Sequence, residues 1–213
     1  GIVVAPQDKE NLLPLLYFQS SHDDDPDSYH SLDDYVSRMA DGQSEIYYVI
    51  ADDFSSARRS PHLDAFRQRD IEVLYFSDPV DAMIPMGLDE YQEYPLRSVD
   101  ESDIDLDDVG DIQEDEQPDP LEETTFETLV ERVQRVLGER VSDVRQSKTL
   151  VGSPARLVSD EKGGGRHMYR INRLLDREYE LPVKSLELNP RHPILHNLSN
   201  LLAQNTNNPL IDV

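Results

Sequence analysis

Hydrophobic residues in the first half of the chain alternate between short continuous runs and helically spaced positions. The runs at 46–50 and 71–76 are β-rich and uninterrupted, which is typical of strands covered on both faces. The segment 32–39 has helical spacing, and Ser60-Pro61 begins another helix that continues through Phe66. Strand, helix, strand, helix predicts a parallel pair with a right-handed crossover. We therefore expect a small α/β/α layered subdomain here.

Further helices are predicted on either side of these strands. The apolar residues of 12–18 indicate a short buried helix, with Pro14 near its first turn. Ser31 and Asp34 have the spacing of a capping box at the start of the 32–39 helix. Asp78-Pro79 supplies an N-cap and a first helical residue for a helix through Met83.

The second half opens on a strongly amphipathic helix that Asp119-Pro120 begins and Gly138 ends. Strands are expected at 141–150 and 155–159, paired antiparallel through a turn at 152–154, and a third at 183–188. Gly163-Gly164-Gly165 is a flexible hinge before a helix from about 167 to 178. A final helix is predicted over 192–204. Five of its residues should face the core: Ile194, Leu195, Leu198, Leu201 and Leu202. This order predicts an α+β C-terminal module with a short, mostly antiparallel sheet.

An acidic block separates the two halves. Between Asp100 and Glu123 there are thirteen carboxylates and no Lys or Arg. Such a stretch repels itself, stays hydrated and does not form a core. We therefore predict a first domain at 1–99, an acidic linker at 100–119 and a second domain at 120–213.

Composition narrows the possible partners. The chain has 213 residues and a formal net charge of -24, with 37% hydrophobic residues, enough for one core or two modest ones. A surface with this much negative charge repels phosphate backbones and anionic lipid. This repulsion argues against nucleic acid and membrane as partners. The chain has no Cys, no apolar run of about 20 residues and no signal peptide. A reducing, cytoplasmic location is expected.

Several groups resemble metal or phosphate sites, and each is better explained structurally. Asp103, Asp105 and Asp107 begin like a calcium loop, but the glycine and the closing Glu of that loop are missing. His192 and His196 have zinc-like spacing without a third ligand. His22 lies in an Asp-rich loop. The glycines at 163–165 lack the ending of a phosphate loop, and no Gly-x-Ser-x-Gly pentapeptide occurs.

One apolar stripe has two interpretations. Met168, Ile171, Leu174 and Leu175 share one face of the helix after the glycine hinge, and the other face carries arginines at 166, 170, 173 and 177. The stripe is either an ordinary core-facing surface or an adaptable Met/Leu surface offered to unfolded chains. The pattern alone does not decide between them.

Several separate blocks resemble the heat-shock protein 90 family of bacterial type. The first-half blocks are Ser31-Leu32-Asp33-Asp34-Tyr35-Val36-Ser37-Arg38-Met39, Gly42-Gln43, Ile46-Tyr47-Tyr48, Ser60-Pro61-His62-Leu63, Ile71-Glu72-Val73-Leu74 and Asp78-Pro79-Val80-Asp81. The second-half blocks are Leu137-Gly138-Glu139-Arg140-Val141-Ser142-Asp143-Val144-Arg145 and Glu187-Leu188-Asn189-Pro190. Together these blocks extend over nearly the whole chain in the family's order.

The resemblance implies a segment of a larger chaperone. It places the chain at the distal end of the family's middle domain and most of its C-terminal domain. The ATP- and Mg-binding domain, with the arginine that reaches the γ-phosphate, would lie upstream of Gly1, so this segment should neither bind nor hydrolyse ATP. The family's homodimerisation helices would begin near Asn208, so most of that interface should be missing.

The resemblance also implies client-binding residues. The family's client-contacting amphipathic helix aligns with Ile171, Leu174 and Leu175, with Met168 near its first apolar position. A second client contact, an acidic residue followed by Trp, corresponds to Ala82 and Met83. The expected function is therefore that of a client-binding and lever segment of a molecular chaperone, with unfolded proteins as partners and no cofactor of its own.

Two alternatives remain from the sequence. One makes the first half a small hydrolase or transferase, with its site at the carboxyl ends of the two strands near Asp52 and Ser77. The other makes the chain an inert scaffold for dimerisation.

Overall fold

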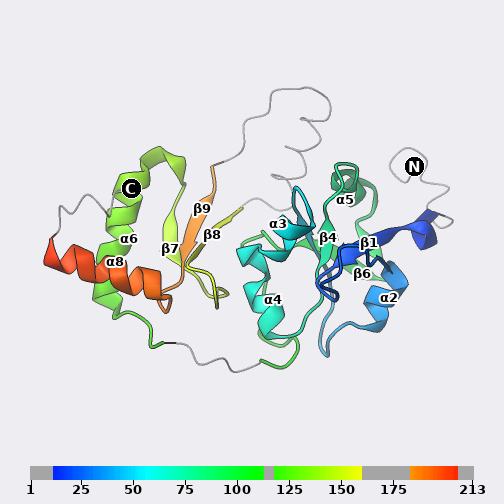
Figure 1. Cartoon of the computed structure of the whole chain (residues 1–213), viewed down its shortest axis with the longest axis horizontal. Helices are drawn as coiled ribbons and strands as arrows, with labels where there is room; N and C mark the ends of the chain where they lie inside the picture. The colour runs from blue at the N-terminus through cyan, green and yellow to red at the C-terminus, as the bar shows by residue number, and fades with distance from the viewer. Residues whose placement is uncertain (1–11, 113–117, 160–182, 206–213) are drawn as a thin grey trace.

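The computed structural model describes residues 12–112, 118–159 and 183–205, which form two lobes lying side by side (Figure 1). The first lobe comprises residues 12–112, and the second comprises the other two ranges. The fold is of the mixed α/β kind, with a six-stranded sheet in the first lobe and a three-stranded sheet in the second.

The first sheet has the strand order β2-β1-β4-β3-β6-β5. Its strands are β1 (Tyr17–Ser20), β2 (His30–Ser31), β3 (Ile46–Ile50), β4 (Leu74–Phe76), β5 (Glu90–Tyr91) and β6 (Tyr94–Ser98). The central strand β3 pairs parallel with β4 and with β6, while β1 joins β4 antiparallel. The predicted parallel pair is thus confirmed, and the β5–β6 hairpin was not predicted.

Helices cover both faces of this sheet. Tyr47 and Val49 of β3 pack in one cluster with Ala57 of α3 (Phe54–Arg58) and Phe66 of α4 (Asp64–Gln68). Ile46, Tyr48 and Ile50 pack in a second cluster against α2 (Leu32–Ser37) and α5 (Ile84–Gly87). All five residues of β3 are buried, as the uninterrupted apolar run predicted. Short 3₁₀ turns complete the lobe at Leu13–Leu15, Pro61–Leu63 and Asp81–Met83.

The α2 segment is fixed to the sheet by polar contacts. Ser31 and Asp34 form the predicted capping box at its start. The buried Tyr35 hydroxyl donates to the Glu72 carbonyl at 2.9 Å and accepts from the Tyr47 N–H at 3.0 Å and the Gln43 amide at 2.9 Å. Burial is the main reason that the pKa of Tyr35 is raised, so the phenol stays neutral.

Replacing Tyr35 with Phe should lower the free energy of unfolding of the first lobe by about 2 kcal/mol. The change removes only the hydroxyl, and it leaves the Tyr47 N–H and the Glu72 carbonyl without this buried partner. Urea unfolding followed by circular dichroism measures the loss. The exposed Tyr29 provides a matched control, since Tyr29→Phe should change stability by less than about 0.5 kcal/mol.

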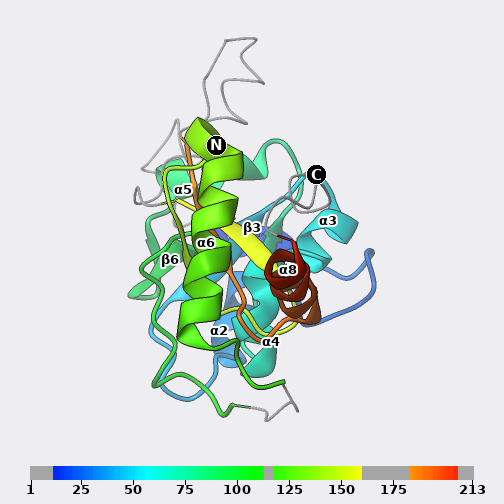
Figure 2. The same ribbon diagram turned by 90° about the vertical axis from the view of Figure 1, so that its left-hand side faces the viewer.

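The second lobe packs two long helices on one sheet, as the view in Figure 2 shows. Its elements are α6 (Glu123–Leu137), a 3₁₀ turn at Gly138–Arg140, β7 (Val144–Gln146), β8 (Ala155–Val158), β9 (Ser185–Leu188) and α8 (Pro193–Gln204). Phe126 and Leu129 of α6 meet Leu195 of α8 over Val144 and Leu188 of the sheet. Gly138 ends α6 with a φ of 54°, a conformation that glycine adopts at no steric cost.

Several local predictions were wrong. The amphipathic helix α6 begins at Glu123 and not at Asp119-Pro120. The second sheet has one parallel and one antiparallel pair, so it is not mostly antiparallel. Tyr17 and Phe18 belong to β1 and not to a helix. The strands β7 and β8 do not pair with each other, because β9 lies between them, parallel to β7 and antiparallel to β8. The 3₁₀ turn that ends at Met83 begins at Asp81 and not at Pro79. Ile194, expected to point inward, is 51% exposed in the first turn of α8.

The acidic stretch is not fully hydrated, contrary to expectation. Leu106 and Val109 are buried in the same cluster as Tyr47 and Phe66. The loop also packs closely on Gly42, where any side chain would collide with the Asp108 carbonyl. The few apolar residues between the carboxylates therefore anchor this part of the block to the first lobe, while the carboxylates at 103, 105, 107, 108 and 111 are exposed. Within the ranges that the structure describes, no helix has the length and apolarity needed to cross a membrane.

Candidate functional site

One carboxylate of the first lobe makes several hydrogen bonds to the second lobe. Asp64, the first residue of α4, accepts hydrogen bonds through Oδ2 from three consecutive backbone N–H groups of the second lobe. The distances are 3.4 Å from Val151, 3.1 Å from Gly152 and 2.7 Å from Ser153, and the Ser153 hydroxyl adds a contact of 3.2 Å to Oδ1. Successive N–H groups that converge in this way form a cradle for an anion.

Asn189 holds the same loop from the other side. Its side-chain amide donates to the Val151 carbonyl at 3.0 Å and to the Ser153 carbonyl at 3.2 Å. Asn189 is itself buried directly after β9. The loop 151–153 is therefore clamped between a carboxylate of the first lobe and an amide of the second.

A second tie joins the ends of two strands. Just beyond β6, Glu101 forms an isolated parallel bridge with Ser159, and the Ser159 N–H donates to the Asp100 carbonyl at 3.1 Å. The Lys184 ammonium lies 3.2 Å from the Asp100 carboxylate. We call these contacts, together with those of Asp64, the lobe junction.

The Glu101 carboxyl, next to the lobe junction, has a perturbed pKa. Burial raises the pKa of Glu101 above its usual value, although Arg97, 3.0 Å away, partly offsets that rise. A carboxyl with a raised pKa is buried at least cost when it is protonated. The contribution of Glu101 to stability is therefore largest below the usual pKa of a glutamate and declines as pH rises through its raised pKa.

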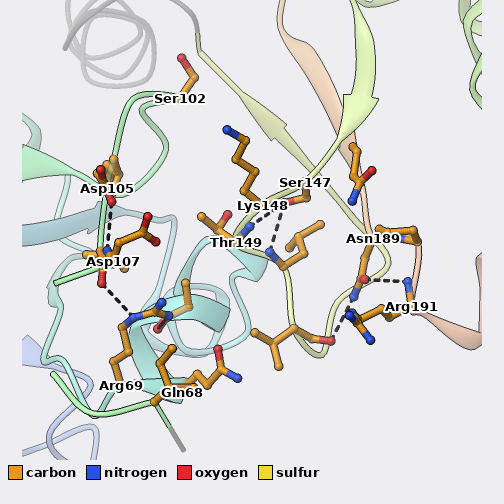
Figure 3. Close-up of a pocket in the computed structure, with 18 of the residues that line it drawn as sticks. Gln68, Arg69, Ser102, Asp105, Asp107, Ser147, Lys148, Thr149, Asn189 and Arg191 are labelled. Carbon is orange, nitrogen blue, oxygen red and sulfur yellow. Dashed lines mark hydrogen bonds between the residues drawn. The ribbon is translucent and has the colours of Figure 1, made fainter. Parts of the chain in front are cut away.

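A cavity of about 720 Å³ opens between the lobes (Figure 3). One wall carries Asp103, Asp105 and Asp107, and the opposite wall carries Lys148 and Arg191. Ser147 accepts from the Thr149 and Leu150 N–H groups, so the loop that carries Lys148 has an internal support. The first wall also carries Arg69, so it is acidic only on balance, while the charged residues of the opposite wall are basic. The opposite net charges attract across a space wide enough to hold water.

The carboxyl ends of β3 and β4 do not carry an enzyme-like arrangement. Asp52 and Ser77 line one open depression, as predicted from their positions. However, the Ser77 hydroxyl donates to the Gln19 side chain at 2.7 Å, and none of the described lining residues is a histidine. A serine nucleophile needs a base within hydrogen-bond reach. These contacts give the hydrolase alternative no support.

Only one predicted client-binding residue can be placed. Met83 is half-buried at the end of the 3₁₀ turn that precedes α5, and the neighbouring Met86 is 48% exposed. Ala82 is fully buried and offers nothing to a partner. Met168, Ile171, Leu174 and Leu175 lie outside the described residues.

Two of the suspected metal ligands have structural partners. His192 is the N-cap of α8 and accepts from the Ile194 N–H through Nδ1 at 3.1 Å. Asp103 pairs with Arg97 at 2.8 Å. Among the residues that the structure places, no three His, Asp or Glu side chains converge on a metal position.

The chain belongs to the heat-shock protein 90 family. The family model described as Hsp90 protein matches residues 1–212.

Within that family the chain is similar to bacterial proteins named Chaperone protein HtpG. It is 41% identical to the one from Halorhodospira halophila over 199 residues, which cover 93% of this chain and 31% of the relative. The corresponding values are 36% over 208 residues for Nitratidesulfovibrio vulgaris (96% and 33%) and 39% over 199 residues for Methylococcus capsulatus (93% and 31%). The chain thus spans about a third of the length of the curated relatives it matches.

The lobe junction was not predicted from the sequence. Asn189 lies inside a block that carried the resemblance, and Asp64 directly follows another such block. Both are polar residues at the end of an apolar run, and this position is the sequence signal that could have identified them. Their partners are about 35 to 90 positions away along the chain, a separation that local pattern does not report.

Proposed function

We propose that this chain is the client-binding and lever segment of an ATP-dependent molecular chaperone. The observation that carries the proposal is the similarity to HtpG chaperones over 93–96% of the chain. Its partners would be unfolded or partly folded proteins and a second copy of the full-length protein, and its location the cytoplasm. ATP and Mg would be bound elsewhere in the full-length protein.

The proposed division of labour assigns one domain to most of each lobe, although residues 100–112 of the proposed linker pack on the first lobe. Residues 1–99 would be the distal part of the middle domain, 100–119 an acidic linker and 120–213 the C-terminal domain. In support, the relatives are about three times longer than the stretch that matches this chain. The ATPase activity and dimerisation of the full-length protein are part of this proposal.

Client binding would use adaptable apolar side chains. Met83, together with Met168, Ile171, Leu174 and Leu175, supplies flexible Met and aliphatic groups that can repack on many sequences. The net charge of -24 would keep a protein with such a surface soluble and monodisperse between clients.

The lever role is supported by the contacts between the lobes. Asp64 and Asp100 fix the second lobe on the first at two separate points. A cavity with oppositely charged walls lies beside the Asp64 contact. A movement of the first lobe would therefore be passed to the second lobe through these polar contacts.

Leu174→Asp in the full-length protein should weaken the holding of an unfolded client about tenfold. A carboxylate on an apolar binding face must be desolvated against the client, which costs binding free energy. The test is suppression of aggregation of a chemically denatured client, measured by light scattering. Ile194→Asp is the matched control, because Ile194 is an exposed aliphatic residue outside the proposed surface.

Two outcomes would count against this assignment. If Leu174→Asp lowers the thermal unfolding midpoint of the second lobe far more than Ile194→Asp does, the stripe is core-facing. If both variants hold the client as well as the parent protein does, client binding at this helix is wrong. Met83→Ser tests the first-lobe contact in the same assay, with Met86→Ser as its neighbour control.

A further inference from the structure

One face of the first sheet extends beyond the helices that cover it. Phe18 packs on the α2 side, so the alternation along β1 turns Tyr17 and Gln19 toward the α3 side. There the Phe54 ring of α3 covers Tyr75, with ring centroids 5.6 Å apart. Toward β2 this face is open: Tyr17 is 58% exposed and Tyr29 is 56% exposed.

The open face forms one side of a groove of about 700 Å³. Its other side is the segment from Ser77 to Asp81, where Val80 is 64% exposed. α3, β4 and β1, which border the groove, lie together in the first lobe (Figure 1). Two tyrosines and a valine therefore face one depression, an arrangement of amphipathic rings and an aliphatic group that suits peptide binding.

The rim of the groove is acidic. Its described lining residues include Asp52, Asp53, Asp78 and Asp81, and none of them is Lys or Arg. The Ser56 N–H donates to Asp53 at 2.7 Å and holds the pKa of Asp53 below its usual value. Asp78 and Asp81 each accept a backbone N–H, at 2.8 and 2.9 Å. The backbone donor at Asp53 therefore stabilises the charged form of that carboxylate.

We propose that this groove binds an extended peptide segment in which Lys or Arg alternates with aliphatic or aromatic residues. The apolar side chains would pack on Tyr17, Tyr29 and Val80, and the cations would lie along the carboxylates and over the tyrosine rings. This inference rests on the proposed chaperone function, since such a segment would be part of an unfolded client. A second copy of this chain fits poorly, because its net charge of -24 would meet an acidic rim.

The test uses two fluorescein-labelled nonapeptides with the same Leu and Phe residues, one with Lys and one with Glu at the alternate positions. Fluorescence anisotropy with this chain should give a dissociation constant at least about tenfold lower for the Lys peptide. Tyr17→Ser should weaken its binding about tenfold and Asp52→Asn about threefold. Raising the salt from about 50 to about 500 mM should weaken it further.

The controls are Leu15→Ser and Asp89→Asn, which change an exposed aliphatic residue and an exposed carboxylate of the same lobe outside the groove. Equal binding of both peptides, or binding that Tyr17→Ser and Asp52→Asn leave unchanged, would overturn the proposal. The proposal would also be overturned if light scattering showed a dimer and Val80→Ser dissociated it, because the groove would then hold a second copy of the chain. If the peptide result is negative while client holding still depends on Leu174, the groove alone is wrong and the chaperone assignment stands.

Discussion

Glu187→Ala should lower the free energy of unfolding of the second lobe by about 3–5 kcal/mol. Glu187 lies in β9, the central strand of the three-stranded sheet. It is opposite Arg145 of β7 on one side and Arg156 of β8 on the other. Its carboxylate is 2.8 Å from the Arg156 Nε and 3.3 Å from the Arg145 Nε, and it accepts the Ser147 hydroxyl at 3.1 Å. One carboxylate thus connects all three strands.

The size of the expected effect follows from burial. The side chains of Arg156 and Glu187 are 6% and 8% exposed. Removing Glu187 leaves the Arg156 guanidinium buried without its counter-charge, which costs far more than losing an exposed ion pair. The partly exposed Arg145 can turn toward water, so Arg145→Ala should cost only about 1 kcal/mol.

Chemical denaturation followed by circular dichroism measures these differences, and Glu187→Gln separates charge from shape. The double variant Glu187→Ala with Arg156→Met should recover part of the loss, because it removes the unpaired charge as well. A loss below about 1 kcal/mol for Glu187→Ala would contradict the account and show that water reaches Arg156 in the variant.

The sequence predicted those parts of the fold that are determined locally. The β3 run is apolar at every position, and every one of its residues is buried because helices cover both sheet faces. Ser31 and Asp34 form their capping box with partners three residues apart. Such signals need no knowledge of distant segments.

The errors occur where distant pairing decides the structure. Tyr17 and Phe18 lie in a leucine-rich stretch that looks helical, but they pair with Ser31 and His30 of β2. The next two residues of the same strand pair with β4, more than fifty residues later. The insertion of β9 between β7 and β8 likewise overrides the hairpin that the turn at 152–154 indicated. Leu106 and Val109 are buried because they pack in one apolar cluster with Phe66. Counting the charges along the block did not predict this packing.

The blocks that carried the family resemblance now have physical roles. The Tyr35 hydroxyl accepts a hydrogen bond from the Tyr47 N–H of β3 and donates one to the Glu72 carbonyl. Glu187 connects three strands. Asn189 clamps the loop that Asp64 holds. Sequence identified these residues as a pattern, and the geometry shows that they connect elements within and between the two lobes.

Asp64→Ala should uncouple the two lobes without unfolding either one. The change removes the acceptor of three backbone N–H groups and one hydroxyl, which should weaken the lobe junction by about 2–4 kcal/mol. The second-lobe loop would keep its Asn189 contacts, so its own fold should remain. Asp64→Asn, which keeps one carbonyl oxygen, should have a smaller effect.

Distances between spin labels on the two lobes measure this coupling. The chain contains no Cys, so Ser55→Cys and Thr124→Cys place one label on each lobe at exposed positions. The distance distribution should be narrow in the parent protein, broad in Asp64→Ala and unchanged in the control Asp89→Ala. An unchanged distribution in Asp64→Ala would mean that the Lys184–Asp100 contact and the Glu101–Ser159 bridge suffice to hold the lobes. In that case the lever would act through the strand ends and not through the 151–153 loop.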